Sequence, residues 1–168
     1  MGNQNFRYEP LPEGYLRLVQ LKTRPLLNIC LELSAFALKQ APDFTALSYT
    51  WGGEERSQLI NLQGRQFHII PNLESFLWEA KHQIELSRVE QNHDEGSWNG
   101  AWLWIDSICI DQSNSEEKSA QVAMMKDIYE AAKTIISWLG VLDDDAKLGM
   151  EYILDIDHFR EPWSRAHP

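Results

Sequence analysis

The chain has 168 residues, of which 43% are hydrophobic and 24% charged, so it is long and apolar enough for a globular domain and is not a disordered polypeptide. Its formal net charge of −10 argues against nucleic acid or an anionic membrane surface as the main partner. No apolar run reaches the length of a membrane span and no signal peptide precedes the fold, so we expect a cytoplasmic protein in which Cys30 and Cys109 are buried thiols.

The first half of the chain predicts an arm followed by strands. Residues 1–14 are polar with two prolines and predict the arm. Alternating or continuous apolar residues, bounded by turn formers, predict strands. These segments are 15–21, 26–33, 44–51, which ends at Gly52-Gly53, and 57–70, a hairpin turning at 63–65.

The second half alternates helices with apolar strands. A helix opens at Pro71-Asn72, and its buried face is expected to comprise Leu73, Phe76, Leu77, Ala80 and Ile84. Residues 88–100 predict a loop, and 101–110 form a nearly continuous apolar run that predicts a buried strand.

A second helix has the clearest start, because Asn114 is a good N-cap and Glu117 stands where a capping box requires it. Its expected buried stripe is Gln121, Met125, Ile128 and Ala132, with Val122 and Tyr129 alongside. A further buried strand is expected at 134–140 and a last helix at 143–159.

This order predicts an α/β fold with a mostly parallel sheet flanked by helices, to which the first two strands and the hairpin add antiparallel pairs. We expect one domain over 15–160, preceded by the arm at 1–14 and followed by a tail at 161–168 that is the cut end of a longer protein.

Candidate site residues follow the ends of three strands, where open parallel sheets bind their ligands. They are expected to meet at one edge if the strands are neighbours. The first segment holds Ser48, Tyr49, Trp51 and Gly52, the second runs from Asp106 to Gln112, and the third is Leu139-Gly140 with Glu151 on the helix that follows.

Each of these residues also has a structural interpretation. The first segment fits an ordinary strand that ends in a glycine turn, and Asp106 fits a carboxylate that binds nearby backbone N–H groups. Asp111 with Gln112 fits loop organisation, and Glu117 fits the capping box. Gln121 lies on an apolar stripe, so its amide is expected to bond to the loop around Asp111.

The sequence offers no conventional cofactor or metal motif. The five histidines lack metal spacing and a cysteine partner, so no metal site is predicted. There is no Gly-x-Gly-x-x-Gly, no P-loop lysine and no Gly-x-Ser-x-Gly elbow.

Four blocks, "YEPLPEGYLRLVQL", "FTALSYTWGG", "NLESFLWEAK" and "LWIDSICIDQSNSEEKSAQVAMMKDIYEAAKTIISWLG", together resemble the fungal heterokaryon incompatibility (HET) domain from about Tyr8 to Gly140. Small departures are Ser107 where the family usually has Ala, Asp111 where Asn is common, and Asn114 where Asp is common. The resemblance implies a cytosolic effector of non-self recognition that triggers cell death and is often fused to other recognition domains.

The HET domain in turn resembles the TIR fold, a flavodoxin-like arrangement, and some TIR domains hydrolyse NAD. This resemblance implies that "ALSYTWGG", "LWID" and "TIISWLG" are the first three TIR strands, and that Glu151 stands for the catalytic glutamate, with Glu117 as the next candidate. Substrate contacts are then expected from Ser48, Tyr49, Trp51, Gly52, Asp106, Asp111 and Gln121. NAD is then the expected substrate, cleaved to nicotinamide and ADP-ribose or a cyclic form of it, and no cofactor is expected.

Two hypotheses remain open from the sequence. The first is an enzyme that depletes NAD, since a carboxylate beside the ribose can stabilise an oxocarbenium-like transition state. The second is a non-catalytic module that signals through homotypic contacts, for which seven tryptophans offer apolar surface. The two can coexist, because TIR-type sites are often completed by a neighbouring subunit, and a homo-oligomer is expected on activation.

Overall fold

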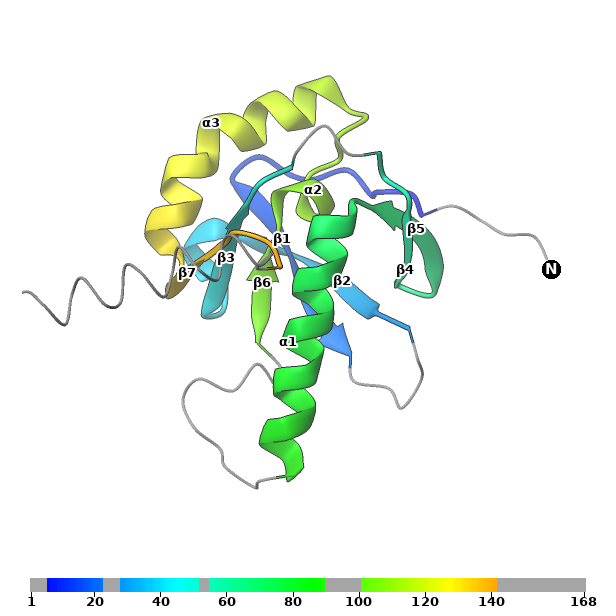
Figure 1. Cartoon of the computed structure of the whole chain (residues 1–168). Helices are drawn as coiled ribbons and strands as arrows, with labels where there is room; N and C mark the ends of the chain where they lie inside the picture. The colour runs from blue at the N-terminus through cyan, green and yellow to red at the C-terminus, as the bar shows by residue number, and fades with distance from the viewer. Residues whose placement is uncertain (1–5, 23–27, 52–54, 90–100, 142–168) are drawn as a thin grey trace, which may run out of the picture.

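The structure, a computed structural model, describes residues 6–22, 28–51, 55–89 and 101–141 (Figure 1). One seven-stranded sheet lies at its centre. The strands are β1 (Tyr15–Lys22), β2 (Cys30–Ala37), β3 (Phe44–Tyr49), β4 (Gln58–Leu62), β5 (Arg65–Ile69), β6 (Trp102–Trp104) and β7 (Thr134–Trp138). The helices are α1 (Pro71–Val89), α2 (Asp106–Cys109) and α3 (Ser115–Ala131), with a 3-10 turn at Leu38–Gln40.

The sheet has the order β5-β4-β2-β1-β6-β3-β7 and mixes two kinds of pairing. Strands β6, β3 and β7 form a parallel block, and β2 pairs in parallel with β4. Strand β1 is antiparallel to both β2 and β6, and β4 is antiparallel to β5. The antiparallel N-terminal strands and the hairpin are therefore confirmed. The prediction of a mostly parallel sheet is wrong, because β1 lies in the middle of the sheet and not at its margin.

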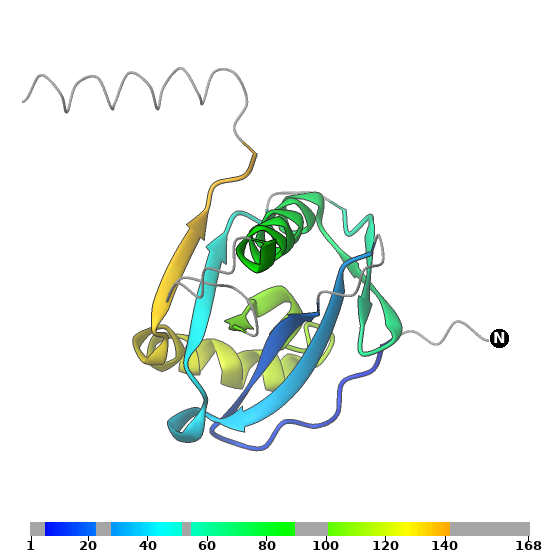
Figure 2. The same ribbon diagram turned by 90° about the horizontal axis from the view of Figure 1, so that it is seen from below.

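Helices α1 and α3 lie on opposite faces of this sheet (Figure 2). The predicted buried face of α1 is confirmed, because all five of its expected apolar residues, Leu73, Phe76, Leu77, Ala80 and Ile84, are buried. Phe76 meets the ring of Trp138 on β7 with centroids 5.6 Å apart. Burying this stripe against the sheet stabilises α1 far more than its intrinsic propensity does.

Helix α3 begins as predicted and covers the other face. The Asn114 side chain accepts hydrogen bonds from the N–H groups of Glu116 and Glu117, which confirms the N-cap. Ile128 is fully buried, and Tyr129 packs edge-on against Trp104 of β6 with centroids 5.4 Å apart. Val122, expected beside the buried stripe, is 52% exposed instead.

The strand expected over 101–110 ends early. Only Trp102–Trp104 is strand, and Asp106–Cys109 is one helical turn in which the N–H groups of Ile108 and Cys109 donate to the Ile105 carbonyl over 3.0 and 2.7 Å. A short continuous apolar run fits a buried strand and a buried helical turn equally well, so periodicity could not separate them. Asp106 therefore opens a helical turn and does not end a long strand.

Two other strands differ from expectation. Strand β2 starts at Cys30, four residues later than predicted, because its residues pair one by one with β1 from Tyr15 opposite Ala37 to Lys22 opposite Cys30. Strand β7 was expected to be buried, yet Ile135 is 52% exposed. The reason is that β7 is an edge strand of the sheet within the described residues.

The hairpin turn forms where the sequence places it. Gln63 and Gly64 both adopt positive φ, 52° and 80°, as a two-residue type I′ turn requires. The Gly64 N–H donates to the Asn61 side chain over 2.7 Å, which closes the turn. The register between β4 and β5 is thereby fixed locally.

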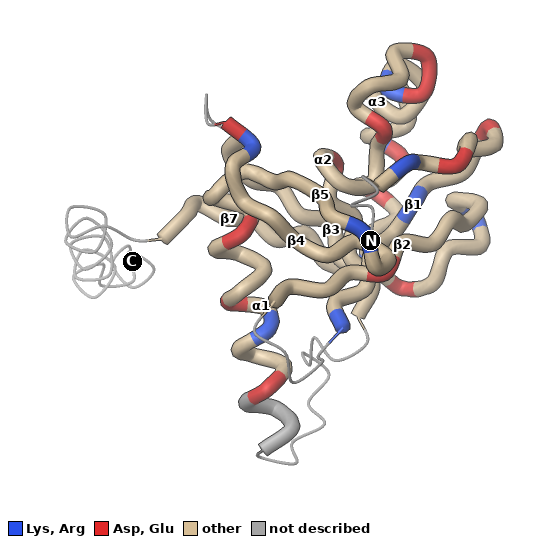
Figure 3. Tube along the Cα trace, turned by 90° about the vertical axis from the view of Figure 1, so that its right-hand side faces the viewer, with Lys and Arg blue, Asp and Glu red and all other residues tan. Residues whose placement is uncertain are grey.

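Charged residues occur along most of the described chain. Acidic and basic positions are interspersed, and both α1 and α3 carry several acidic residues (Figure 3). In the described ranges no helix combines the length and apolarity that crossing a membrane requires.

Candidate functional site at the ends of β3 and β6

The carboxyl ends of β3 and β6 bring two predicted site residues into contact. These strands are parallel neighbours, with Phe44 opposite Trp102. Trp51, just beyond β3, donates its indole N–H to both carboxylate oxygens of Asp106, over 3.2 and 3.1 Å. The predicted convergence of these two segments is therefore confirmed.

Asp106 is held by its own helical turn as well. The Ser107 N–H donates to the Asp106 carboxylate over 2.7 Å. Burial raises the pKa of the Asp106 carboxyl, and the hydrogen bonds from Ser107 and Trp51 and the positive charge of Arg56 offset only part of this effect. Asp106 is thus a more basic carboxylate than an exposed aspartate.

Two aromatic rings stand beside this carboxylate. Tyr49 and Trp51 stack with centroids 6.4 Å apart and planes 26° from parallel. The Tyr49 hydroxyl donates to the Ser107 hydroxyl over 2.5 Å, which joins β3 to α2. Burial raises the pKa of Tyr49, so its hydroxyl stays protonated. Trp51 is 37% exposed, so part of its side chain is accessible to a ligand.

The amino end of α1 completes this edge through a residue that sequence analysis missed. The Asn72 side chain donates to the Thr50 carbonyl and accepts from the Trp138 indole, both over 3.0 Å. A side chain at Gly140, where φ is +104°, would approach the Asn72 amide oxygen to 3.3 Å. Asn72 therefore ties the ends of β3 and β7 together. No local pattern in the sequence distinguishes it from an ordinary residue in a first helical turn.

A buried ion pair lies behind α2. The Arg17 guanidinium donates to the two carboxylate oxygens of Glu117 over 2.5 and 2.9 Å, and the two side chains are only 4% and 8% exposed. The Asp111 N–H donates to the same carboxylate over 2.8 Å. Glu117 thus holds the loop after α2 to β1.

This arrangement corrects the expected capping box. The N–H of Asn114 donates to the Asp111 carbonyl and not to Glu117. Glu117 instead binds Arg17, a partner 100 residues away in sequence. Glu117 was the second candidate for catalysis, but its carboxylate already accepts three hydrogen bonds.

The N-terminal arm packs onto the same region. The Tyr8 hydroxyl donates to the Ile108 carbonyl over 2.7 Å, and the Arg17 guanidinium lies 4.9 Å from the Tyr8 ring centroid. Arg17 also donates to the carbonyls of Glu9 and Cys109, over 2.6 and 3.1 Å. Sequence analysis did not select Tyr8 or Arg17 as site residues, although both lie in the first block of the family resemblance and Arg17 is a charged residue inside the apolar stretch 15–21.

Three predicted site residues have other surroundings. Ser48 is exposed, and the Tyr129 hydroxyl donates to the carbonyl of the preceding residue, Leu47, over 3.5 Å. The Asp111 carboxylate accepts from the N–H and the hydroxyl of Ser113, over 3.0 and 2.6 Å, as expected for loop organisation. Gln121 is buried but donates to the Tyr15 carbonyl over 2.8 Å, so its expected bond to the Asp111 loop is wrong.

The remaining predicted site residues, Gly52 and Glu151, lie outside the described residues, as do the expected helix 143–159 and the tail 161–168. Their roles stay predictions. Within the described part of the chain, no group of three or more His, Cys, Asp and Glu side chains is arranged to hold a metal ion.

Comparison with known proteins identifies the family. The model of the heterokaryon incompatibility protein (HET) family matches residues 44–167, most of the chain and all of the β3–β6–β7 block. The chain belongs to the HET family. This HET domain is also 35% identical, over 120 residues, to heterokaryon incompatibility protein 6, OR allele, of Neurospora crassa. The matched stretch is 68% of this chain and 17% of that relative.

No solved structure is detectably similar to this HET domain, so its resemblance to the TIR fold stays a prediction. The family match begins at residue 44. Tyr8 and Arg17 therefore lie outside the matched range, although both contact α2 or the residues that follow it. The arm and β1 thus add structural support to the family block.

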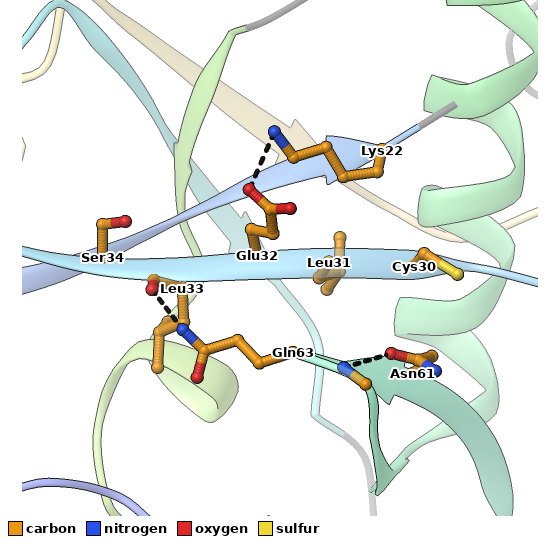
Figure 4. A pocket seen from close by; sticks show the side chains of 9 residues that line it. Lys22, Cys30, Leu31, Glu32, Leu33, Ser34, Asn61 and Gln63 are labelled. Atoms are coloured by element: carbon orange, nitrogen blue, oxygen red, sulfur yellow. Dashed lines mark hydrogen bonds and ion pairs between the residues drawn. The ribbon is translucent and has the colours of Figure 1, made fainter. Parts of the chain in front are cut away.

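Two hollows differ in whether their charged side chains form ion pairs with other described residues. One, of about 500 Å³, lies along β2 and β4 (Figure 4). There Lys22 pairs with Glu32 at 2.8 Å, and the Gln63 amide donates to the Leu33 carbonyl over 2.6 Å. The other, of about 300 Å³, lies between the arm, β5 and the loop after α2, and it includes Arg56.

Proposed function

We propose that this HET domain acts in fungal heterokaryon incompatibility by hydrolysing NAD to nicotinamide and ADP-ribose, in the cytoplasm and as a homo-oligomer. Membership of the HET family and the similarity to heterokaryon incompatibility protein 6 support the role in incompatibility. The relative is much longer than this chain, so other recognition domains are proposed partners as well.

The observation that carries the chemistry is the contact between Trp51 and Asp106. An aromatic ring and a partly desolvated carboxylate lie together where two parallel strands end, the usual place for a ligand in such sheets. The indole face can stack on the nicotinamide ring, and the carboxylate can bind ribose hydroxyls.

The reaction needs little beyond such a site. The bond between ribose C1′ and the nicotinamide nitrogen breaks, and its electron pair neutralises the pyridinium ring of the leaving group. Positive charge then develops at C1′, where a nearby carboxylate stabilises it. Water attacks C1′ and loses a proton. A carboxylate whose pKa is raised, as burial raises that of Asp106, is suited to accept that proton.

The two carboxylates have separable roles in this proposal. Asp106 binds the ribose and accepts the proton of the attacking water, and Glu151 stabilises the developing charge, as the resemblance to TIR domains implies. Glu117 serves structure, because its carboxylate binds Arg17 and the Asp111 N–H.

The test is release of nicotinamide from NAD by the purified chain, measured by chromatography at high protein concentration with and without a crowding agent. Asp106→Asn and Glu151→Gln are expected to lower turnover at least ~100-fold, a common effect of losing a charge-stabilising group. Asp127→Asn, an exposed carboxylate on α3, is the matched control and is expected to keep full activity. Absence of nicotinamide under every condition would refute the proposal.

A second candidate is a non-catalytic assembly module. Exposed apolar side chains at and beyond edge strand β7 favour it, since Ile135, Leu139 and Val141 are all more than half exposed. In that case Leu139→Glu is expected to abolish self-association in analytical ultracentrifugation, and Asp106→Asn is expected to leave cell killing intact. Loss of killing with Asp106→Asn would exclude a purely structural role.

A further inference from the structure

A small cavity beside the candidate site carries two arginines. It has a volume of about 300 Å³, and its walls come from the arm, from β5 and from the loop after α2. Arg7 and Arg56 line it, together with Asp111. Neither guanidinium forms an ion pair with another described residue. The cavity thus holds a local excess of positive charge in a chain whose net charge is −10.

Among the described residues that line this cavity, the one carboxylate already accepts hydrogen bonds. The Asp111 side chain accepts from the N–H and the hydroxyl of Ser113. Its charge is therefore partly compensated within the loop, and both guanidinium forks are left for an external anion. Guanidinium groups bind phosphate oxygens through paired hydrogen bonds, which makes phosphate the fitting ligand chemistry.

The cavity shares residues with the Trp51–Asp106 site. Gln112 lines the cavity and donates its side-chain N–H to the Asp106 carbonyl over 3.1 Å. Arg56 also lines the cavity, and its charge lowers the pKa of Asp106 and of Tyr49 against the larger effect of burial. A ligand in the cavity therefore lies one residue, Gln112, away from Asp106, whose carboxylate is proposed to bind ribose.

The cavity walls are held by packing. Phe6, Tyr8 and Phe67 form an edge-to-face cluster with ring centroids 4.9 to 6.3 Å apart. The Tyr8 hydroxyl is fixed to the Ile108 carbonyl. Such walls need little ordering when a ligand binds, so less affinity is lost to entropy.

We propose that this cavity is the phosphate-binding part of the nucleotide site, where Arg56 and Arg7 hold the diphosphate of a ligand whose ribose lies beside Asp106. The proposal deepens the proposed function and rests on it for the identity of the nucleotide. It assigns a binding role to the arm, which lies outside the range matched by the family model.

The test is calorimetric titration of the full 168-residue chain with ADP-ribose, ADP, nicotinamide riboside and inorganic phosphate. ADP-ribose and ADP are expected to bind, and nicotinamide riboside, which lacks phosphate, at least about tenfold more weakly. Arg56→Gln and Arg7→Gln are each expected to weaken ADP-ribose binding about tenfold, near 1.4 kcal/mol. Arg65→Gln, which removes an arginine that does not line this cavity, is the matched control and is expected to bind as wild type.

Both cavity arginines are exposed, so these variants are expected to unfold at the wild-type temperature, which circular dichroism checks. Higher salt is expected to weaken ADP-ribose binding to wild type more than binding to Arg56→Gln. ADP-ribose that fails to bind wild type, or binds both arginine variants with wild-type affinity, overturns the inference.

Nicotinamide release separates the two proposals. Arginine-dependent ADP-ribose binding without any NAD cleavage supports the phosphate site and refutes the enzyme. Cleavage of NAD that is unaffected by both arginine substitutions supports the enzyme and refutes the phosphate site.

Discussion

Replacing Glu117 by Gln tests whether the ion pair behind α2 holds the site together. The substitution keeps the shape of the side chain and an oxygen that can accept from the Asp111 N–H. It removes the negative charge that faces Arg17, whose side chain is only 4% exposed. The buried guanidinium then keeps only uncharged acceptors: the carbonyls of Glu9 and Cys109 and the amide oxygen of the substituted side chain.

Removing one partner of a buried ion pair typically costs ~3–5 kcal/mol, because the other charge stays buried without compensation. These uncharged acceptors place the loss for Glu117→Gln near the lower end, at about 3 kcal/mol. Arg17→Met leaves the Glu117 carboxylate with the Asp111 N–H alone, so about 4 kcal/mol is expected. The double variant contains no lone buried charge. Its loss in free energy of unfolding is therefore expected to be ~1–3 kcal/mol smaller than the sum of the two single losses.

Urea unfolding followed by tryptophan fluorescence measures these free energies of unfolding. The control is Asp43→Asn, which breaks the ion pair between Asp43 and Lys133. That pair has a similar separation, 3.0 Å, but its side chains are 79% and 69% exposed, so a loss below ~1 kcal/mol is expected. A Glu117→Gln loss no larger than that of Asp43→Asn would show that Arg17 finds adequate solvation elsewhere and that the reasoning is wrong.

Three further predictions concern Asp106, the cysteines and the core. Because burial raises the folded-state pKa of Asp106 above its ordinary value of 3.8, the contribution of Asp106 to stability is present below that value and is lost as pH rises through the folded-state pKa. Asp106→Asn is therefore expected to be more stable than wild type at pH 7. In urea unfolding at pH 3.5 this stability advantage is expected to disappear. An advantage of equal size at both pH values would contradict this account. Burial raises the pKa of the Cys109 thiol to about 12. A thiol reagent at pH 8 is therefore expected to modify Cys30 quickly and Cys109 only as fast as the chain unfolds. Mass spectrometry of the labelled peptides measures the two rates. Leu77→Ala is expected to cost ~2–5 kcal/mol in the same unfolding assay, since Leu77 is fully buried between α1 and the sheet, whereas exposed Leu59→Ala on β4 is expected to cost less than ~1 kcal/mol.

The features that the sequence determined by itself are local ones. The apolar spacing along residues 73–84 placed the buried face of α1, and Asn114 marked the start of α3. The hairpin turn at Gln63 and Gly64 follows from the residues in the turn and the strands beside it. The order of β3, β6 and β7 along the chain also predicted that Trp51 and Asp106 would meet, because parallel neighbours end at the same edge.

The features that only the tertiary structure decided join distant segments. The sequence predicted that Glu117 is half of a capping box. In the structure it binds Arg17, which lies 100 residues earlier in the chain. Residues 106–109 of the apolar run form a helical turn. The sequence could not predict this, because no periodicity separates a short buried strand from a short buried helix. Arg7 and Arg56 lie outside every motif, and they line one cavity with Tyr8 because the arm folds back across β5 and α2. Hydrogen bonds and ion pairs of this kind depend on three-dimensional distance, which sequence spacing does not encode across different elements.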